Sequence, residues 1–351
     1  MPKAVMNNTK IKGISTVVPR KEVSLLDDKN LYNGDEKKIK RVIESSGFLK
    51  RRVADKSTTT SDLCEFAAKK LIEQLNIDVS SIDGLIFSSY TPDYIMPATS
   101  YVLHKKLGLS ENCICMDVPQ ACSGYVLGLY QSSMMLNSGC KKILLLAGDT
   151  FSKFTDMFRD NSAPVFGDAA SATLLEYDES AEPIYFDIKS DGTKYESLIC
   201  KNGGFRHPPS PLDFYENKEY KYNAKMQGAE IFNFTIEKIP VSISEVLEFS
   251  NTDKSSVDLF ILHQANKFIL NNIAQTLNID TAKMPMGNIT KYGNQCGASI
   301  PCTISEILNE KTSDTKLKLL ISGFGAGLSW ASAVITFDKV RCSKILEYEE
   351  K

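Results

Sequence analysis

An internal duplication constrains the fold of this 351-residue chain more than any other feature of its sequence. A constant offset carries the segment 80–83, Ser-Ser-Ile-Asp, onto the segment 255–258, Ser-Ser-Val-Asp. The same offset carries the apolar segment 144–146 onto 319–321, and each of the four segments leads into or forms a predicted strand. Several matches in one order predict two related halves of alternating strands and helices, which is an α/β fold.

We therefore divide the chain into an N-terminal half, 1–180, and a C-terminal half, 181–351, and this length can bury two ordinary cores. Within the N-terminal half, 11–17 predicts a strand of edge character and 113–118 a short buried strand. The segment 203–226 is rich in Pro, Tyr and Lys and has little periodicity. We expect it to be a loop that caps a pocket.

Cys122 lies where the strand at 113–118 gives way to a helix. Pro119 interrupts the strand, and apolar residues recur at helical spacing from Val126 onward. At such a junction the free N–H groups and the positive end of the helix dipole stabilise a thiolate. Most cysteines are nevertheless small buried thiols, so the position alone does not identify a nucleophile.

The duplication supplies partners for Cys122. The offset carries Cys122 onto Gly297, three residues after Asn294, and it carries Ser88 onto His263, which closes a buried strand. An approximate twofold axis would bring these strand ends to one pocket, where α/β proteins place their chemistry. A cysteine can take an acyl group from a thioester, and a histidine and an amide can donate hydrogen bonds to an oxyanion. These residues are the predicted catalytic set.

Charge and composition limit the partners of the protein. With a net charge of -2, the chain offers no electrostatic reason to expect nucleic acid or an anionic membrane surface as a partner. No apolar run has membrane-spanning length and the N-terminus lacks a signal-peptide core, so we expect a cytoplasmic protein. The nine cysteines include no CxxC pair and no His-rich set accompanies them, so we expect neither disulfides nor a metal.

Four motifs follow one another along the chain: Gln120-Ala121-Cys122-Ser123-Gly124, His263-Gln264-Ala265-Asn266, Gly293-Asn294 with Ala298-Ser299-Ile300-Pro301, and Gly323-Phe324-Gly325-Ala326-Gly327 with Trp330. In order and spacing they resemble the β-ketoacyl-acyl carrier protein synthase III family of the thiolase superfamily, over nearly the whole chain. The resemblance implies a thiolase-like five-layered α-β-α-β-α fold and a homodimer. It also implies a ping-pong condensation that uses acyl-CoA and malonyl-acyl carrier protein as substrates and no cofactor.

The resemblance implies a role for each residue of the site. Cys122 would accept the acyl group, and His263 and Asn294 would stabilise the enolate that forms when malonyl-acyl carrier protein loses carbon dioxide. The resulting carbanion would attack the acyl-Cys122 thioester to give a 3-oxoacyl-acyl carrier protein. The backbone N–H groups of Cys122 and Ala326 would form the oxyanion hole.

Four further residues are assigned to substrate binding by the same resemblance. Arg41, with Ser45, stands where the family commonly has the Trp and Arg that clasp the CoA adenine. Lys267 lies beside the place of an Arg that often meets the carrier protein, and Met96 resembles the aromatic residue that the other subunit contributes to the acyl tunnel. Phe324 belongs to the glycine-rich motif. These departures leave open whether CoA or a carrier protein delivers the first acyl group.

Other functions of the same fold make different demands. An acyltransferase could pass the acyl group from Cys122 to an oxygen or nitrogen nucleophile, in a secondary-metabolite or surface-glycan pathway. A 3-hydroxy-3-methylglutaryl synthase would need an acidic residue just after the first-half strand, and 88–91, Ser-Ser-Tyr-Thr, has none. A non-enzymatic scaffold is disfavoured because Cys122, His263 and Asn294 are all present.

Overall fold

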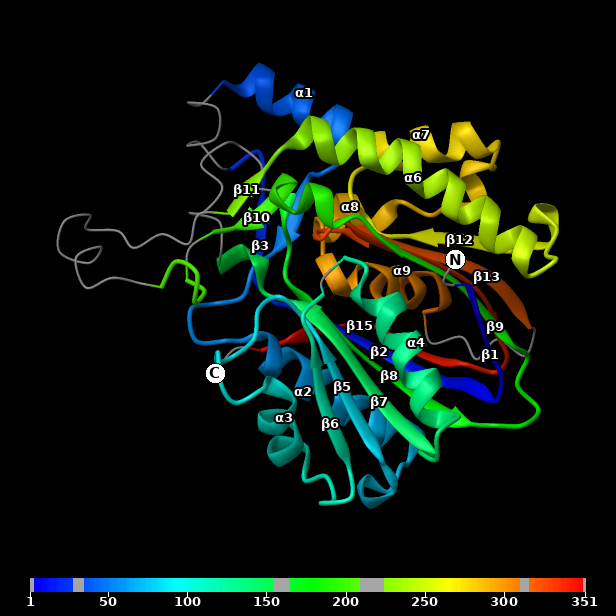
Figure 1. Cartoon of the computed structure of the whole chain (residues 1–351). Coiled ribbons are helices and arrows are strands. Elements are labelled where there is room, and N and C mark those ends of the chain that lie inside the picture. The colour runs from blue at the N-terminus through cyan, green and yellow to red at the C-terminus, as the bar shows by residue number, and fades with distance from the viewer. Residues whose placement is uncertain are drawn as a thin grey trace.

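The computed structural model of the protein describes residues 3–27, 35–120, 122–153, 165–201, 203–208, 224–309 and 316–349. Two β-sheets are stacked with helices between them and on both outer faces (Figure 1). The order of layers is therefore helix, sheet, helix, sheet, helix. This confirms the predicted five-layered α/β fold class.

The first sheet has the strand order β15-β2-β8-β7-β5-β6. In chain order its strands are β2 (Thr9–Pro19), β5 (Gly84–Ser88), β6 (Ile114–Val118), β7 (Lys142–Asp149), β8 (Ala169–Tyr177) and β15 (Arg341–Tyr348). β5 runs parallel to β6 and β7, whereas β8 runs antiparallel to both β7 and β2. The parallel strands β5, β6 and β7 therefore end at one edge, close to Cys122.

The second sheet repeats this pattern with the order β1-β9-β14-β13-β12. Its strands are β1 (Lys3–Met6), β9 (Ile184–Ser190), β12 (Leu259–Leu262), β13 (Leu317–Gly325) and β14 (Ser329–Phe337). β12 is parallel to β13, which is antiparallel to β14. Two small hairpin-like pairs complete the strands: β3 (Glu22–Ser24) with β4 (Lys50–Arg52), and β10 (Leu198–Cys200) with β11 (Ala224–Met226).

The duplication is visible at the level of single hydrogen bonds. The 3₁₀ turns Val79–Ser81 and Lys254–Ser256 precede β5 and β12. Each turn is capped by an aspartate: Asp78 accepts from the backbone N–H of Ser80 at 3.0 Å, and Asp253 accepts from that of Ser255 at 2.8 Å. The matching sequence segments therefore form matching turns, because a short carboxylate at this position satisfies an N–H that the turn leaves unpaired.

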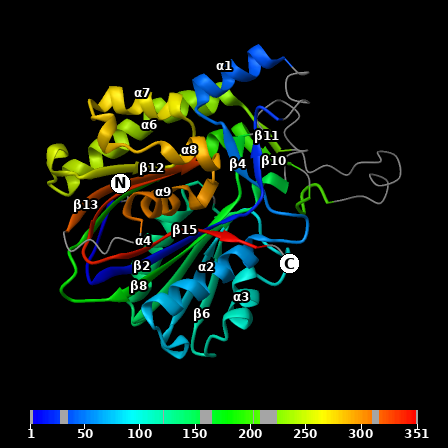
Figure 2. The same cartoon turned by 180° about the vertical axis from the view of Figure 1, so that it is seen from behind.

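Helices α4 (Gly124–Leu136) and α9 (Ser299–Leu308) form the middle layer, since each packs against both sheets. Figure 2 shows α9 above β15 and β2. A helix enclosed in this way must be apolar around most of its circumference. Tyr125 of α4 and Ile304 of α9 accordingly join Leu145 and Ile321, one from each sheet, in one buried cluster.

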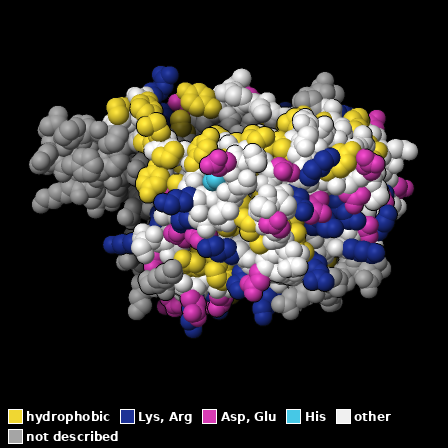
Figure 3. All heavy atoms as spheres, turned by 90° about the horizontal axis from the view of Figure 1, so that it is seen from below, with side chains coloured by type: hydrophobic (Ala, Val, Ile, Leu, Met, Phe, Trp, Pro, Cys, Tyr) yellow, Lys and Arg dark blue, Asp and Glu magenta, His cyan; other side chains and the backbone are white. Residues whose placement is uncertain are grey.

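The remaining helices cover the outer faces. The first sheet is covered by α2 (Thr60–Leu75) with α3 (Thr99–Leu107), and the second by α6 (Gly228–Phe249) with α7 (Lys267–Leu277). Two further helices, α1 (Glu36–Ser46) and α8 (Gly287–Tyr292), pack near α7 and β4 respectively. Basic and acidic side chains are interspersed over the face seen in Figure 3. Among the helices of the described residues, none is long and apolar enough to cross a membrane.

The sheets exchange their terminal strands. β1, from the start of the chain, pairs with β9 in the second sheet, whereas β15, from its end, pairs with β2 in the first. The predicted division at 180 and 181 stays a prediction, but each sheet contains a strand from the other side of it. Of the predicted cap loop at 203–226, the residues 209–223 lie outside the described residues.

The pairing of β15 with β2 shows that the predicted edge character of 11–17 was wrong. The strand expected at the edge, β2, lies between β15 and β8, and its long apolar run is consequently buried. The strand expected to be buried, β6, is itself the edge of the sheet, and Ile114 at its start is 52% exposed. β2 is interior because it pairs with β15 from the end of the chain. β6 is an edge strand because no further strand among the described residues pairs with it.

A short parallel bridge joins loops of the two halves beside Cys122. Phe166 pairs with Asn294. Asn294 donates its backbone N–H to Val165 at 2.7 Å, and Gly167 donates to the Asn294 carbonyl at 3.0 Å. The backbones meet so closely that a Cβ atom on Gly167 would lie 1.9 Å from the carbonyl oxygen of Tyr292.

The substitution Gly167→Ala should therefore destabilise the protein, because the loop of Tyr292 must shift to admit a methyl group. We expect a loss of about 1–3 kcal/mol of unfolding free energy in urea denaturation, as for other overpacked sites. Gly228→Ala is the matched control, since nothing lies within 4 Å of the place that a Cβ atom would take there. Equal stability of Gly167→Ala and the unaltered protein would contradict the close approach.

Candidate functional site

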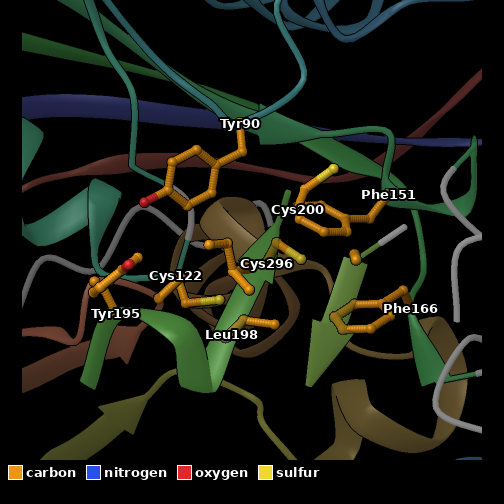
Figure 4. A pocket seen from close by; sticks show the side chains of 12 residues that line it. Tyr90, Cys122, Phe151, Phe166, Tyr195, Leu198, Cys200 and Cys296 are labelled. Atoms are coloured by element: carbon orange, nitrogen blue, oxygen red, sulfur yellow. The ribbon is translucent and has the colours of Figure 1, made fainter. Parts of the chain in front are cut away.

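Cys122 lies between the end of β6 and the start of α4, one residue before the N-cap Ser123. Its side chain is half-buried and faces a pocket (Figure 4). Gly124 allows the helix to begin this close to the sheet, because a Cβ atom there would lie 2.2 Å from Oγ of Ser88, at the end of β5. The nucleophile predicted from sequence is thus held at the junction of a strand and a helix.

The end of β13, from the other half of the chain, lies directly against Cys122. A Cβ atom on Gly323 would be 2.7 Å from the Cys122 carbonyl oxygen. On Gly325 it would be 2.8 Å from Cβ and 3.1 Å from Sγ of Cys122. Glycine is therefore required at both positions, and the next residue, Ala326, lines the same pocket as the thiol.

His263 follows the last residue of β12 and is 3% exposed. Its Nδ1 is 2.8 Å from Oγ of Ser299, and its ring meets that of Phe324 edge-on with centroids 5.3 Å apart. The serine hydroxyl can donate to Nδ1, which leaves the ring proton on Nε2. In that tautomer the imidazole presents an N–H group to the thiol of Cys122, with which it is hydrogen-bonded.

Asn294 joins the site through its own loop. Its Oδ1 accepts the backbone N–H of Cys296 at 3.0 Å, which fixes the orientation of the amide and leaves Nδ2 as the donor. The side chain of Cys296 in turn is hydrogen-bonded to that of Cys122. The loop that the duplication placed opposite Cys122 therefore lies beside it.

The surroundings of Cys122 favour its thiolate. The pKa of Cys122 is held well below its usual range by the hydrogen bond from Cys296 and, against the effect of burial, by the charge and hydrogen bond of His263. Burial and the same contact raise the pKa of Cys296 well above the usual range. Elsewhere burial raises the pKa of Cys113 and Cys302 to about 12. Cys122 is thus the thiol prepared to act as a nucleophile.

Asp149, the last residue of β7, connects this site to the first sheet. It is fully buried and accepts three hydrogen bonds: from Oγ of Ser89 at 3.1 Å, from the N–H of Tyr90 at 2.9 Å and from the N–H of Gly297 at 3.1 Å. Burial raises the pKa of its carboxyl to about 8, against the lowering effect of these donors. Asp149 therefore fixes the backbone just after Cys296.

The pocket in front of the thiol has a volume of about 390 Å³ and is mainly apolar. Figure 4 shows aromatic rings from separate segments around Cys122 and Cys296. The lining residues are Tyr90, Cys122, Phe151, Phe166, Tyr195, Leu198, Ile199, Cys200, Ala224, Cys296, Ala326 and Gly327. Such a lining suits an apolar chain attached to a thioester.

The structure separates the predicted substrate-binding residues. Phe324 is buried against His263, and like Arg41, Lys267 and Met96 it is not among the residues that line the pocket. Arg41 is exposed on α1, and the stem of Lys267 lies over Gly47, where a Cβ atom would be 2.4 Å from its Cδ. Met96 is 85% exposed. Within the described residues, no group of three or more His, Cys, Asp or Glu side chains is arranged to hold a metal ion.

Comparison with known proteins identifies the family. Residues 247–337 match the family model 3-Oxoacyl-[acyl-carrier-protein (ACP)] synthase III C terminal, and 116–192 match 3-Oxoacyl-[acyl-carrier-protein (ACP)] synthase III. The β-ketoacyl-[acyl-carrier-protein] synthase III of Streptococcus mutans is 34% identical over 84% of this chain and 89% of its own. That of Streptococcus pneumoniae is 31% identical over 93% and 98%. The chain belongs to the synthase III family.

The solved structures agree with this family. The crystal structure of a 3-oxoacyl-(acyl-carrier protein) synthase from Burkholderia xenovorans LB400 matches with a TM-score of 0.91 and 35% identity, over 99% of each chain. The resemblance seen in the sequence motifs is confirmed, and so is the class of enzyme that it implied, a condensing acyltransferase of the thiolase superfamily. The roles of individual residues stay predictions.

Sequence reasoning missed two residues of this synthase III site. No sequence pattern singles out Cys296, although the offset from Cys122 lands next to it, on Gly297. Asp149 ends an apolar strand whose neighbours also end near the pocket. The shared strand edge could have identified Asp149, but only the contact with Cys122 identifies Cys296.

Alkylation by iodoacetamide should select Cys122 at neutral pH, because its thiolate is stabilised while burial suppresses ionisation of the other buried thiols. Cys296→Ala removes a contact that stabilises the thiolate, so the midpoint of the alkylation rate against pH should rise. Peptide mass spectrometry over a pH series measures this.

Cys140→Ala is the control for this experiment. Cys140 lies between α4 and β7, away from the pocket lining, and its removal should leave the profile of Cys122 unchanged. An unchanged profile in Cys296→Ala as well would show that the second thiol does not stabilise the first.

Proposed function

We propose that this protein condenses an acyl group, held on Cys122, with malonyl-acyl carrier protein to give a 3-oxoacyl-acyl carrier protein. The observation that carries the proposal is the thiol of Cys122, which is hydrogen-bonded to His263 beside the glycine-rich end of β13 and faces an apolar pocket. Relatives that match the chain over most of its length are named for acyl carrier protein substrates.

In the first half-reaction the Cys122 thiolate attacks the carbonyl carbon of an acyl thioester. The oxygen that becomes negative would meet the backbone N–H groups of Cys122 and Ala326, and the donor thiol leaves as the acyl-Cys122 thioester forms. Preorganised N–H groups are effective here because they need no reorientation as charge develops. The thioester supplies the activated acyl group, so the proposal includes no cofactor.

In the second half-reaction malonyl-acyl carrier protein loses carbon dioxide, and the electrons of the broken C–C bond form an enolate. Nε2–H of His263 and Nδ2–H of Asn294 would donate to the enolate oxygen, as their fixed partners Ser299 and Cys296 leave these donors available. The enolate carbon then attacks the acyl-Cys122 carbonyl. The thiolate that departs is the stabilised one, which favours completion of the cycle.

Intact-protein mass spectrometry with acyl-CoA and acyl-carrier donors should show one acyl adduct, absent in Cys122→Ala and retained in Cys140→Ala. Added malonyl-acyl carrier protein should remove the adduct with release of carbon dioxide. Loss of the adduct to an oxygen or nitrogen acceptor without carbon dioxide would favour the acyltransferase alternative. An adduct that persists in Cys122→Ala would overturn the assignment of the nucleophile.

Asn294→Asp separates the two half-reactions. The aspartate keeps an oxygen to accept the N–H of Cys296 but removes the amide donor, so the loop should hold while enolate stabilisation is lost. We expect the acyl adduct to form and carbon dioxide release to fall about 10²–10³-fold, as for removal of other oxyanion donors. Equal losses of both steps would show that Asn294 acts on the loop and not on the enolate.

We also propose that the protein is a homodimer that pairs through the edge of its first sheet. β6 is an edge strand of the first sheet, so one side of its backbone can pair with another strand. Exposed apolar side chains lie on β6, on α3 and on the loop that precedes α3. They are Tyr94 at 60%, Ile95 at 76%, Met96 at 85%, Tyr101 at 58% and Ile114 at 52% exposure. A twofold axis through β6 would cover this patch, and Met96 would then reach the other subunit.

Ile95→Asp with Ile114→Arg should therefore shift the protein from twice the mass of one chain to a single chain in light scattering after gel filtration. Burying two charges at the centre of an apolar interface costs more than such an interface can offset. Val241→Asp, on the outer face of α6 with 50% exposure, is the control and should leave the mass unchanged. A monomeric unaltered protein would contradict the proposal.

We place the protein in the cytoplasm. No disulfide joins the nine cysteines, which all lie among the described residues. Reduced thiols next to one another are typical of proteins in a reducing compartment. Fractionation of cells that express the tagged chain, with cytoplasmic and extracytoplasmic markers, tests this location.

A further inference from the structure

The acyl pocket contains a second thiol that the condensation does not use. Cys296 and Cys122 line the same cavity and belong to one packed cluster (Figure 4). Cys296 is 1% exposed, so its thiol faces the pocket and Cys122 and not bulk solvent. Two thiols that meet in one cavity can form a disulfide when their Cα atoms lie within bonding range of that bridge.

The backbone of Cys296 is held in an unusual conformation. Its φ is 45°, in the left-handed region that non-glycine residues adopt at a cost. Hydrogen bonds hold the backbone on both sides of this residue. Oδ1 of Asn294 accepts the N–H of Cys296 at 3.0 Å, and Asp149 accepts the N–H of Gly297 at 3.1 Å. The loop is thereby fixed in the conformation that directs this side chain to Cys122.

We propose that Cys122 and Cys296 form a peroxide-sensitive pair, whose reversible disulfide switches off the acyl nucleophile and protects it from irreversible oxidation. This inference concerns the regulation of the proposed site and rests on Cys122 as its nucleophile. The two cysteines differ in pKa in the way that such a pair needs. Cys122 ionises readily and reacts with the oxidant, whereas Cys296 stays protonated and is not oxidised first.

The oxidant is a hydroperoxide, and the steps balance with hydrogen peroxide. The Cys122 thiolate attacks one oxygen, the O–O bond breaks, hydroxide leaves and a sulfenic acid forms on Cys122. The sulfur of Cys296 then attacks the Cys122 sulfur, the S–O bond breaks, and the departing hydroxide takes the thiol proton as water. The two cysteines lose two electrons in total, and the peroxide is reduced to one water and one hydroxide. The hydroxide takes up the proton that Cys122 released on ionisation, which gives the second water. A reducing dithiol reverses the bond by thiol-disulfide exchange.

Cys200 is the competing thiol, because it lines the same pocket from β10. It is exposed, however, whereas Cys296 is buried and in contact with the nucleophile. The contact between Cys296 and Cys122 predicts that Cys122 forms its disulfide with Cys296 and not with Cys200.

The test treats the reduced, full-length protein with hydrogen peroxide, blocks remaining thiols with iodoacetamide and maps the peptides without reduction. We expect a Cys122–Cys296 cross-link, loss of two hydrogen atoms from the intact mass, and loss of Cys122 labelling that dithiothreitol restores. Cys200→Ser should form the same cross-link. In Cys296→Ser, Cys122 should instead gain oxygen atoms as sulfinic and sulfonic acids, and dithiothreitol should not restore its labelling.

A cross-link from Cys122 to Cys200, or oxidation of Cys122 to sulfinic acid in the unaltered protein without a cross-link, would overturn the inference. The cross-link is read without substrate, so it does not depend on condensing activity. Acylation of the reduced protein is measured separately: a cross-link without acylation would refute the proposed function alone, and acylation without a cross-link would refute the switch alone. Because the decisive result comes from the unaltered protein, it stands even where a variant folds poorly.

Discussion

The close approach of the β13 backbone to Cys122 is the constraint on which the site depends. Gly323 and Gly325 lie where any side chain would overlap the nucleophile. This contact joins the two halves at their centre, because Cys122 precedes a helix of the middle layer and β13 belongs to the second sheet. A thiol between two sheets can therefore receive partners from both of them, which a site on one sheet edge could not provide.

Several buried polar contacts keep that approach in register. Asp149 connects the end of β7 to Gly297, and Asn294 pairs with the loop of Phe166 through its backbone. Ser123 and Ser329 share a hydrogen bond of 2.7 Å across the interface. Buried polar groups lose stability when left unpaired, so these contacts penalise any displacement of one half against the other. The same contacts that hold the fold thus position the thiol, the imidazole and the amide.

Much of the fold could be predicted because the duplication repeats local chemistry. The aspartate-capped turns before β5 and β12 depend on residues within a few positions, so matching segments give matching structure. The edges of the sheets could not be predicted, since β15 pairs with β2 across nearly the whole chain and β6 offers no local sign of its missing neighbour. The contact between Cys296 and Cys122 was hidden for a related reason: it depends on a left-handed backbone angle, which sequence patterns outside glycine and asparagine rarely indicate.

The environment that prepares Cys122 for acyl transfer also exposes it to oxidation. A thiolate is the reactive species toward thioesters and peroxides alike, so a lower pKa increases both reactivities together. Apolar lining restricts the pocket to chains that resemble an acyl group, but it does not exclude a small neutral peroxide. Protection must then come from chemistry within the pocket. A thiol that stabilises the thiolate by hydrogen bonding is placed, by that same contact, to capture the sulfenic acid before a second oxidant arrives. Activation and protection of the nucleophile would therefore share one residue.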